Sequence, residues 1–422
     1  MFEALKNAVR IADLRRKIVY TAALLAVFRI GSYVPVPGVD AKALAERLGA
    51  GTGNIFGFLD LFAGGALGRF TIFAMGVNPY ITASIIIQLL TIVIPKLEEM
   101  AKEGIDGRKK IAQFTRYGTV ALGLVQAFGI TMAARANAAV ADPSFFNLLL
   151  IVMTLTAGTS FLMWLGEKIS ENGIGNGISL IIFTGIVARI PFGAVTTVSA
   201  IGQGGISPVG VAIFLVLALF VLAGVVMVQE GQRRIPVQYA KRVVGRRMYG
   251  GQSSHIPMKV NHAGVIPVIF ASSVLTFPLT LAQFVPALAK VNNLMGYGTA
   301  TYSIFYAVLV IFFTYFYTAV SFNPSEVANN IKKWGGFIPG LRPGKPTAEY
   351  LDRILTRITL AGAVFLAFIA VLPYMSAGVT RVPMQFLYFG GTGLLIVVGV
   401  ALDTMKQIEG HLLMRHYEGF MK

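Results

Sequence analysis

The sequence contains no cysteine, so disulfide bonds and thiolate metal sites are excluded. Charged residues are scarce as well, at 13% of 422 residues, whereas a soluble domain usually has about 25%. Hydrophobic residues instead reach 55%, and the mean hydropathy is +0.70. A soluble core of this size would need helices with a polar face, which the sequence does not supply. The composition therefore indicates a polytopic, all-α membrane protein.

Catalytic signatures are also missing from the sequence. No glycine-rich loop ends in Gly-Lys-Ser or Gly-Lys-Thr, and the nearest string, at residues 104–110, lacks that spacing. The predicted spans contain neither a Ser/His arrangement nor an Asp pair. The histidines lie in predicted loops or the tail, without the spacing of metal ligands: His255, His262, His411 and His416. We therefore predict that the protein is not an enzyme and uses no metal or cofactor.

Uncharged apolar runs of about 20 residues, the length that crosses a bilayer, recur along the chain. They predict ten membrane spans, at residues 18–33, 71–94, 117–132, 146–165, 175–187, 206–228, 263–288, 302–322, 358–374 and 386–402. Arg29 is the one charge within these bounds. It should face protein or water, or lie near the outer end of its span and reach the interface. The other nine spans carry no charge, which disfavours an ion-coupled transporter with a charged midplane site.

Lys and Arg are distributed unevenly between the two sides of the membrane. With the N-terminus in the cytoplasm, 28 of the 36 fall on the cytoplasmic side and seven on the outside, in agreement with the positive-inside rule. Both termini are then cytoplasmic. Five spans per half invert the second half relative to the first, which predicts an inverted repeat with a site between the halves. We assign residues 1–190 to the first half, 191–205 to an external hinge and 206–422 to the second half.

The segment at residues 56–70 is apolar, but at 1.5 Å per residue it is too short to cross a hydrocarbon core of about 30 Å. It carries Asp60 and the Gly64-Gly65 pair, and it leads directly into the second span. Irregular backbone at membrane depth persists only where protein or a water-filled cavity covers it. The segment is therefore predicted to be a re-entrant piece that occupies a cavity.

Two cytoplasmic loops, at residues 230–261 and 323–356, carry seven and five cations. Such loops could set the orientation of the chain, contact anionic lipid head groups or bind an RNA- or protein-rich machine. Orientation needs only a few cations, so these loops exceed that requirement. Arg342 stands on a turn that Pro343 and Gly344 are expected to hold rigid, an arrangement that suits docking.

Three classes of function remain open from the residues alone. A passive channel could use an apolar constriction, which excludes ions by dewetting. A secondary transporter could use the five-plus-five repeat, although it would need a charged or unwound site at the midplane. An intramembrane enzyme would need paired polar groups within the spans. The uncharged spans favour the channel.

Seven segments of the chain carry the motifs of one family. They include LDLFAGGALGRFTIFAMGVNPYITASIIIQLL at 59–90, GIGNGISLIIFTGI at 173–186 and FNPSEVANNIKKWGGFIPGLRPGKPTAEYLDR at 322–353, and the others lie at 103–119, 231–247, 259–278 and 389–398. Over nearly the whole chain they resemble the bacterial SecY family, the channel subunits of the Sec protein translocase. The resemblance implies ten helices in two inverted five-helix halves around an hourglass-shaped pore. It also implies a channel that passes unfolded secretory polypeptides and releases hydrophobic segments sideways into lipid.

The resemblance also implies roles for individual residues. The family's plug helix falls at about 57–70 and includes Leu59, Phe62, Gly64, Gly65, Ala66 and Leu67. The pore ring falls on Val77, Ile81, Ile186, Ile269 and Ile396. The lateral gate, between the second and seventh spans, includes Ile85, Gln88, Ser273 and Phe277. The loop arginines that would contact the ribosome or the SecA ATPase are Arg233, Arg234, Arg246, Arg247 and Arg342.

Partners and location follow from the same resemblance. The family's members work in the bacterial cytoplasmic membrane with SecE and SecG, and with SecA or the ribosome as the driving machine. Signal peptides and nascent chains are the expected substrates. We expect SecDF, YidC and anionic lipids as further partners.

Overall fold

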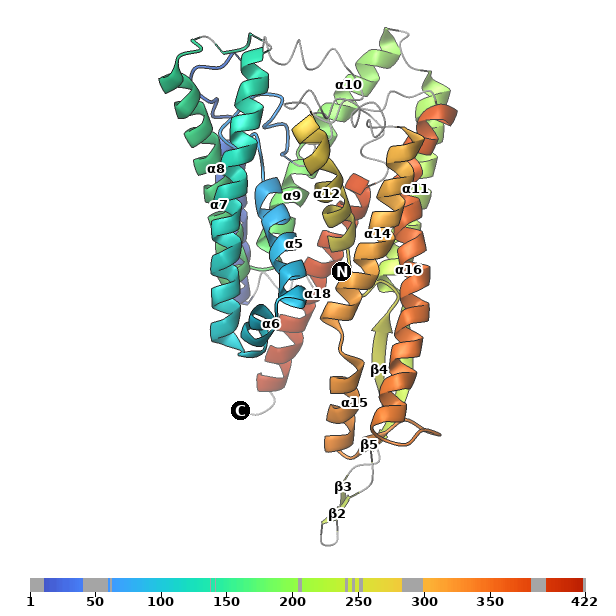
Figure 1. The fold of residues 1–422 in the computed structure, drawn as a ribbon. Coiled ribbons are helices and arrows are strands. Elements are labelled where there is room, and N and C mark those ends of the chain that lie inside the picture. The colour runs from blue at the N-terminus through green and yellow to red at the C-terminus, as the bar shows by residue number, and fades with distance from the viewer. Residues whose placement is uncertain are drawn as a thin grey trace.

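The computed structural model describes residues 11–40, 60, 63–136, 138–140, 142–203, 207–239, 242–244, 247–249, 253–282, 299–380 and 392–419. Most of this chain is helical, and the helices run roughly along one long axis (Figure 1). The predicted all-α class is confirmed. Each of the ten predicted spans coincides with one helix, and the strands are confined to the loops that carry the cations.

The first half contains five helices that match predicted spans one to five: α2 (Ala12–Gly31), α5 (Asn78–Val93), α7 (Ile105–Ala136), α8 (Phe145–Asn172) and α9 (Gly177–Val187). A short helix, α6 (Pro95–Lys102), follows α5 with a bend of 101° between them. Proline at the start of α6 ends the preceding helix, because it lacks the N–H that would continue the ladder. The charged helix α6 therefore points away from the axis of α5.

The second half contains the helices that match predicted spans six to ten: α11 (Pro208–Glu230), α12 (Ile266–Ala282), α14 (Ala300–Ser321), α16 (Lys345–Thr380) and α18 (Thr392–Gly419). Six helical stretches of the described chain are long and apolar enough to cross a membrane, and the bent α5–α6 pair makes a seventh. Four of the six are α7, α8, α11 and α16, and the other two are the stretch Gly177–Gly202, which joins α9 to α10, and the stretch Ala300–Lys333, which joins α14 to α15. The other predicted spans are α2, α12 and α18. They are shorter or more polar along their length, and they pack against helices that do meet the criterion.

Two boundaries differ from the sequence prediction. The second span was predicted to begin at residue 71, but α5 begins at Asn78, because Gly76 takes a left-handed φ of +56° and Pro79 favours a helix start. The hinge predicted at 191–205 is largely helical, since α10 (Ile190–Gly202) fills it. Proline in the first turn of α10 and a run of small apolar residues allow this helix.

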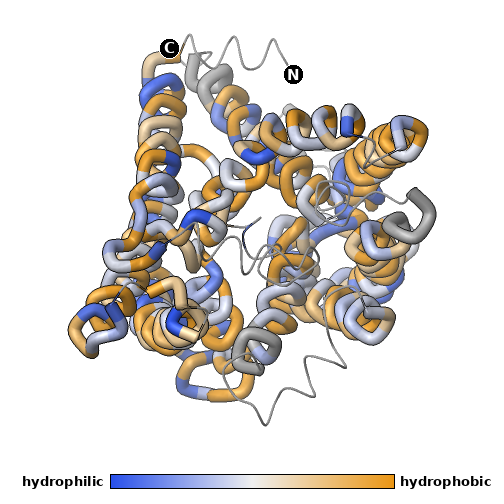
Figure 2. Tube along the Cα trace, turned by 90° about the horizontal axis from the view of Figure 1, so that it is seen from above, coloured by the Kyte–Doolittle hydropathy of each residue, from blue (hydrophilic) through white to orange (hydrophobic). Residues whose placement is uncertain are grey.

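Helix contacts repeat between the halves. In the first half α5 contacts α7 and α8, α8 also contacts α7 and α9, and α2 contacts α8 and α9. The second half has the same pattern, with α11, α12, α14, α16 and α18 in the places of α2, α5, α7, α8 and α9. Because each half has five spans, this repetition is the signature of an inverted repeat. Viewed along the long axis, the helices are apolar over most of their trace (Figure 2).

The principal contacts between the halves form two seams. One seam joins α5 to α12, and the other joins α9 to α18. These four helices stand at the centre of the molecule (Figure 1). A single core of buried hydrophobic side chains continues across both seams. The site between the halves, which the sequence analysis predicted, therefore has to lie where these four helices meet.

The two basic loops form one small unit instead of two separate fingers. The first loop is a hairpin of β1 (Gln232–Tyr239) and β4 (Ser253–Lys259), and β5 (Gly336–Phe337) of the second loop pairs with β1. The tip of the hairpin carries β2 (Arg242–Val244) and β3 (Arg247–Tyr249). Helix α15 (Pro324–Lys333) packs against α16. The unit has its own apolar core, made of Ile235, Val237, Met258, Ile331, Ile338, Leu351, Ile354 and Leu355.

Candidate functional site

Five buried aliphatic side chains lie on or directly before the four seam helices. They are the predicted pore-ring residues Val77, Ile81, Ile186, Ile269 and Ile396, and each is at most 5% exposed. All five belong to the one hydrophobic core that spans both halves. Val77 and Ile81 come from the start of α5, and the others come one each from α9, α12 and α18. The ring residues therefore occupy the four seam helices.

This arrangement gives the constriction two chemical properties. The ring presents branched aliphatic groups without a polar atom, so a passage at this level would exclude ions by dewetting. The four helices belong to different halves, so a small movement at either seam changes the width of the constriction. Aliphatic packing has no directional bonds to break, because its stabilisation follows the apolar area that is buried.

The segment predicted as a plug packs against this ring. Ala66 and Leu67 are buried in the same core as the ring residues. A Cβ atom on Gly64 would lie 2.8 Å from the Cα of Gly185, so the segment approaches the backbone of α9 next to Ile186. Leu59 and Phe62 lie outside the described residues. The described part of the segment thus covers the ring from one side.

In the described part of the predicted plug helix, Asp60 is helical and residues 63–70 form turns, and residues 57–59 and 61–62 lie outside the described residues. Gly64 and Gly65 adopt φ angles of +66° and +86°, a region that side chains with a Cβ rarely enter. The Gly64-Gly65 pair therefore makes the tight turn that points the chain back into the core. Phe70 also has a positive φ, of 45°, and is buried.

Polar contacts hold this segment at both sides. Asp60 accepts from Arg189 at 2.7 Å and from the backbone N–H of Gly68 at 2.8 Å. Arg29, in the last turn of α2, donates to the carbonyl oxygen of Gly64 at 3.1 Å. Arg29 therefore faces protein through its contact with Gly64, which was one of the predicted alternatives, and it also lies at the end of its helix.

Sequence reasoning missed the roles of Arg29 and Arg189 in these contacts. The available signal was weak: each is an isolated cation in an apolar stretch, and Asp60 is an isolated acid in another. Asp60 and Arg189 are 129 positions apart in the sequence. No local pattern joins residues at that separation, so only the fold could pair them.

A cavity of about 420 Å³ lies on the other side of the ring from the plug segment. Ile81 and Ile269 of the ring line it, so its floor is the constriction. One wall, from α12, is apolar and includes Ile266 and Phe270. The opposite wall is polar and consists of Tyr80, Ser84, Gln88, Arg116, Glu167, Ser170, Glu171, Asn176 and Ser179. The cavity is therefore amphipathic and opens between the two halves.

An ion pair organises the polar wall. Arg116 of α7 binds Glu167 of α8 through two nitrogen–oxygen contacts of 2.9 Å, a bidentate geometry. Gln88 donates to Ser84 one turn earlier on α5 at 3.1 Å. Arg116 and Glu167 lie just outside the spans predicted at 117–132 and 146–165, and the sequence alone did not pair them. The pairing fixes α7 to α8 beside the cavity.

The predicted lateral-gate residues lie on the α5–α12 seam. Ile85 and Ser273 are buried, and Gln88 lines the cavity. Phe277 falls within α12, but its side chain lies outside the described part of the structure. The contact between α5 and α12 is thus observed. Its role as a gate for substrates stays a prediction.

The predicted docking arginines lie on the unit formed by the basic loops. Arg233 and Arg234 are exposed on β1, and Arg342 is exposed on a turn. Thr347 donates to the carbonyl oxygen of Arg342 at 2.8 Å, and Gly340 and Gly344 take positive φ angles on either side. Arg246 lies outside the described residues, and Arg247 lies in β3, where side chains are not described. The exposed arginines therefore form a basic, firmly held surface.

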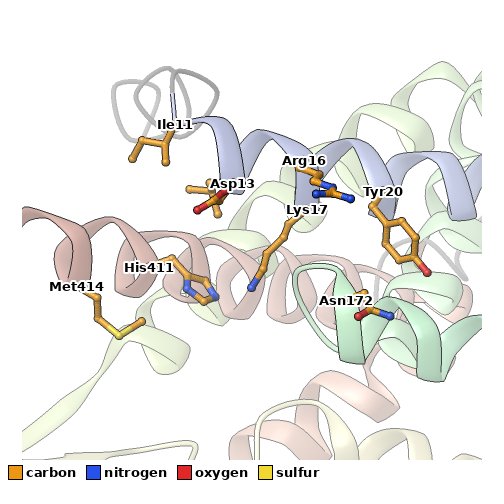
Figure 3. Close-up of a pocket in the computed structure, with 9 residues that line it drawn as sticks. Ile11, Asp13, Arg16, Lys17, Tyr20, Asn172, His411 and Met414 are labelled. Atoms are coloured by element: carbon orange, nitrogen blue, oxygen red, sulfur yellow. The ribbon is translucent and has the colours of Figure 1, made fainter. Parts of the chain in front are cut away.

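A second cavity, of about 650 Å³, lies between the start of α2 and the C-terminal part of α18. Arg16, Lys17 and His411 line it, together with Asp13 and apolar side chains such as Met414 (Figure 3). Lys17 points from α2 towards α18 (Figure 3). The lining of this pocket therefore mixes cationic and apolar side chains with one acid. In the part of the chain that the structure describes, no cluster of His, Asp and Glu could hold a metal ion.

Comparisons with known proteins agree with this architecture. The model of the SecY family matches residues 71–405. The protein translocase subunit SecY of Halalkalibacterium halodurans is 52% identical over 434 residues, and that of Thermotoga maritima is 48% identical over 431 residues. Both alignments cover 100% of this chain, and they cover 100% and 98% of those relatives.

Solved structures share the fold at low sequence identity. A structure described as a protein-conducting channel has a TM-score of 0.65 and 20% identity, and covers 93% of this chain and 91% of its own. A second structure, solved in work on the plug domain of a SecY protein, has a TM-score of 0.64, with 20% identity and coverage of 93% of this chain and 91% of its own. Sec61 from a canine ribosome–channel complex has a TM-score of 0.60 and 18% identity, covering 93% and 91%.

Proposed function

This chain belongs to the SecY family, and we propose that it acts as the passive protein-conducting channel of a bacterial protein translocase. Unfolded secretory polypeptides would cross the membrane between its two halves. Hydrophobic segments would leave sideways into lipid. The chain is not an enzyme, and it supplies the path and the seal while another component supplies the energy.

One observation carries the proposal: the five ring residues lie on the four seam helices, with the plug segment on one side and an amphipathic cavity on the other. A solute carrier would need polar ligands at this level. An aliphatic ring instead suits a polymer of variable side chains, because it can close around each residue without requiring a specific bond.

The geometry gives an order of events. A signal peptide enters the amphipathic cavity and places its apolar segment against the α12 wall, at the seam that includes Ile85, Gln88 and Ser273. Parting of α5 from α12 widens the ring, and the plug segment then leaves its position on the ring. A segment that is apolar enough partitions through the open seam into lipid, because its transfer from water is favourable.

The basic unit is the proposed docking surface for the driving machine. Arg233, Arg234 and Arg342 are exposed on it, and arginine pairs well with phosphate and carboxylate groups. Sec61 was solved in a ribosome complex, and the yeast Ssh1 complex was solved bound to a ribosome. We propose that the ribosome and the SecA ATPase bind here, with Arg246 and Arg247 at the hairpin tip extending the same surface.

The membrane and the remaining partners are proposed on the same basis. The chain is a multi-pass membrane protein, and we place it in the bacterial cytoplasmic membrane with both termini in the cytoplasm, as its cation distribution indicates. SecE and SecG are the proposed companions, with SecDF and YidC as further ones. Arg16 and Lys17 in the pocket between α2 and α18 support contacts with anionic lipids.

Reconstitution tests the proposal. Vesicles that contain this chain with SecE and SecG should take up a radiolabelled secretory precursor when SecA and ATP are supplied, as measured by protection from protease. Vesicles that contain SecE and SecG without this chain are the control. Uptake of small solutes without protection of any precursor would contradict the channel assignment.

A further inference from the structure

The polar contacts of the plug segment form a connected set. The Asp60 carboxylate binds the Arg189 guanidinium with one oxygen and the Gly68 N–H with the other, and the Asp60 carbonyl accepts from the N–H of Gly65 at 2.9 Å. One acid thus organises the turn and also ties it to Arg189, which lies between α9 and α10. The Asp60 side chain therefore both stabilises the plug turn and anchors it to Arg189.

A second cation binds the turn from another helix. Arg29 of α2 donates to the carbonyl oxygen of Gly64 and to the hydroxyl of Tyr33 at 2.8 Å. Arg69 of the plug segment lies over the ring of Tyr33 at 4.1 Å. The segment is therefore held from α2 on one side and from α9 on the other.

The surroundings make the ion pair stronger than an ordinary surface pair. The Asp60 side chain is 11% exposed and that of Arg189 is 29% exposed, whereas the Lys102–Glu98 pair on α6 is 73% and 51% exposed. Exposed pairs contribute little because water screens them. Removing one partner of a sheltered pair leaves a charge without compensation, which is strongly unfavourable.

The ion pair stabilises only the seated position of the plug segment. Both groups are hydrated when they reach water, so the attraction acts only while the plug is seated. Apolar packing of Ala66 and Leu67 stabilises the plug segment on the ring but does not fix its orientation. The ion pair and the Arg29 contact fix that orientation.

On the basis of the function proposed above, we propose that Asp60, Arg189 and Arg29 form a latch that holds the plug segment closed on the ring. They are positioning residues for translocation. The strength of the latch sets how strongly a signal peptide must bind before the channel opens. A weakened latch lets precursors with poor signal peptides pass, and a locked latch would exclude them.

Labelling of a single cysteine measures the latch directly. The chain has no cysteine, and the fully buried Ala66 can be replaced in the Ala66→Cys variant. A membrane-impermeant maleimide reaches this cysteine only when the plug leaves its seat. In the complex with SecE and SecG, Asp60→Asn or Arg189→Gln should raise the labelling rate about 10-fold, the change that corresponds to ~1.4 kcal/mol.

The swapped pair separates a latch from general damage. Combining Asp60→Arg with Arg189→Asp restores opposite charges but not the acceptor for the Gly68 N–H, so the labelling rate should fall part of the way back from that of the single variants to that of the Ala66→Cys parent. Arg135→Gln is the matched control, because Arg135 is an exposed cation at the end of α7. If a variant does not accumulate, Arg29→Gln provides an independent test of the same latch.

Transport gives the second measurement. Latch variants should translocate a precursor with a shortened apolar segment about 10-fold better than the parent, which corresponds to ~1.4 kcal/mol. Unchanged labelling and unchanged selectivity in Asp60→Asn, Arg189→Gln and Arg29→Gln would overturn the latch. Failure of the parent to translocate an intact precursor would instead overturn the proposed function, so the two failures are distinguishable.

Discussion

At the scale of single residues, the protein depends on where it places a few aliphatic and charged side chains. Val77, Ile81 and Ile396 are branched, apolar and buried, which suits the sealing role proposed for them. Asp60 and Arg189 act in the opposite way, because each is costly to shelter and stable only beside its partner. The aliphatic ring can therefore adapt its packing, whereas the plug segment is held in one position by a specific ion pair.

A polar ring residue should open the seal to ions. Ile186→Ser removes a buried aliphatic group beside the plug and supplies a hydroxyl that water can bind. We expect higher ion conductance of the closed channel in planar bilayers, and a free energy of unfolding lower by about 2–4 kcal/mol. Ile86→Ser is the control, since Ile86 is 41% exposed on α5. Equal conductance in the two variants would argue against the ring.

The docking role of Arg342 can be tested by charge reversal. Arg342→Glu keeps an exposed side chain on the same turn but repels the acidic or phosphate groups that arginine would bind. We expect precursor translocation to fall to background while the subunit still enters the membrane and assembles. Arg353→Glu, an exposed cation on α16 in the same unit, should retain most activity. Normal translocation by Arg342→Glu would remove the docking role.

Gly64 should tolerate no side chain. Alanine there would need the left-handed φ of +66° and would place Cβ 2.8 Å from the Cα of Gly185. We expect Gly64→Ala to weaken seating of the plug by about 1–2 kcal/mol from the backbone alone, seen as faster labelling of a cysteine at position 66. Gly202→Ala should have no effect, since nothing lies within 4 Å of that site.

At the scale of elements, the sequence predicted which stretches are helical better than it predicted where each helix begins and ends. Uncharged runs located a helix at each of the ten predicted spans, because length and hydropathy are local properties. The start of α5 was missed by seven residues, since the turn chemistry of Gly76 and Pro79 lies inside an apolar run. The plug turns, the helical α10 and the β5–β1 pairing were missed as well. Each depends on contacts with distant parts of the chain.

The site shows the same division. The ring residues followed from motifs that recur in the family, and the structure brings all five into one core. The Asp60–Arg189 and Arg116–Glu167 pairs link different helices, so no spacing within one element could reveal them. Charged residues within apolar stretches were the one usable signal. They indicate that a partner exists without indicating which.

Tethering the plug element to the ring should block transport. In a variant with Ala66→Cys and Ile269→Cys, a bifunctional maleimide that contains a disulfide can join the two positions, which share one core. We expect precursor translocation to stop on tethering and to recover when the linker is reduced. Either single-cysteine variant treated with the reagent is the control. Continued transport by the tethered protein would mean that the segment does not plug the path.

At the scale of the whole molecule, two five-helix halves meet at two seams, and the path lies between them. The helix contacts repeat between the halves, so the same arrangement of helices flanks both sides of the constriction, although the sequences of the halves differ. The basic unit is attached to α11, α12 and α16 of one half, so a machine that binds it can move that half relative to the other. Opening is thus a movement between bodies that are each firmly packed.

The central claim is that a polypeptide passes through the ring between the halves. A precursor arrested in transit, with photoreactive groups placed at single positions of the channel, tests this most directly. We predict adducts from the ring positions Ile81 and Ile269 and none from Val216, which is 68% exposed on α11. Adducts from Val216 at equal yield, or their absence from both ring positions, would contradict the account.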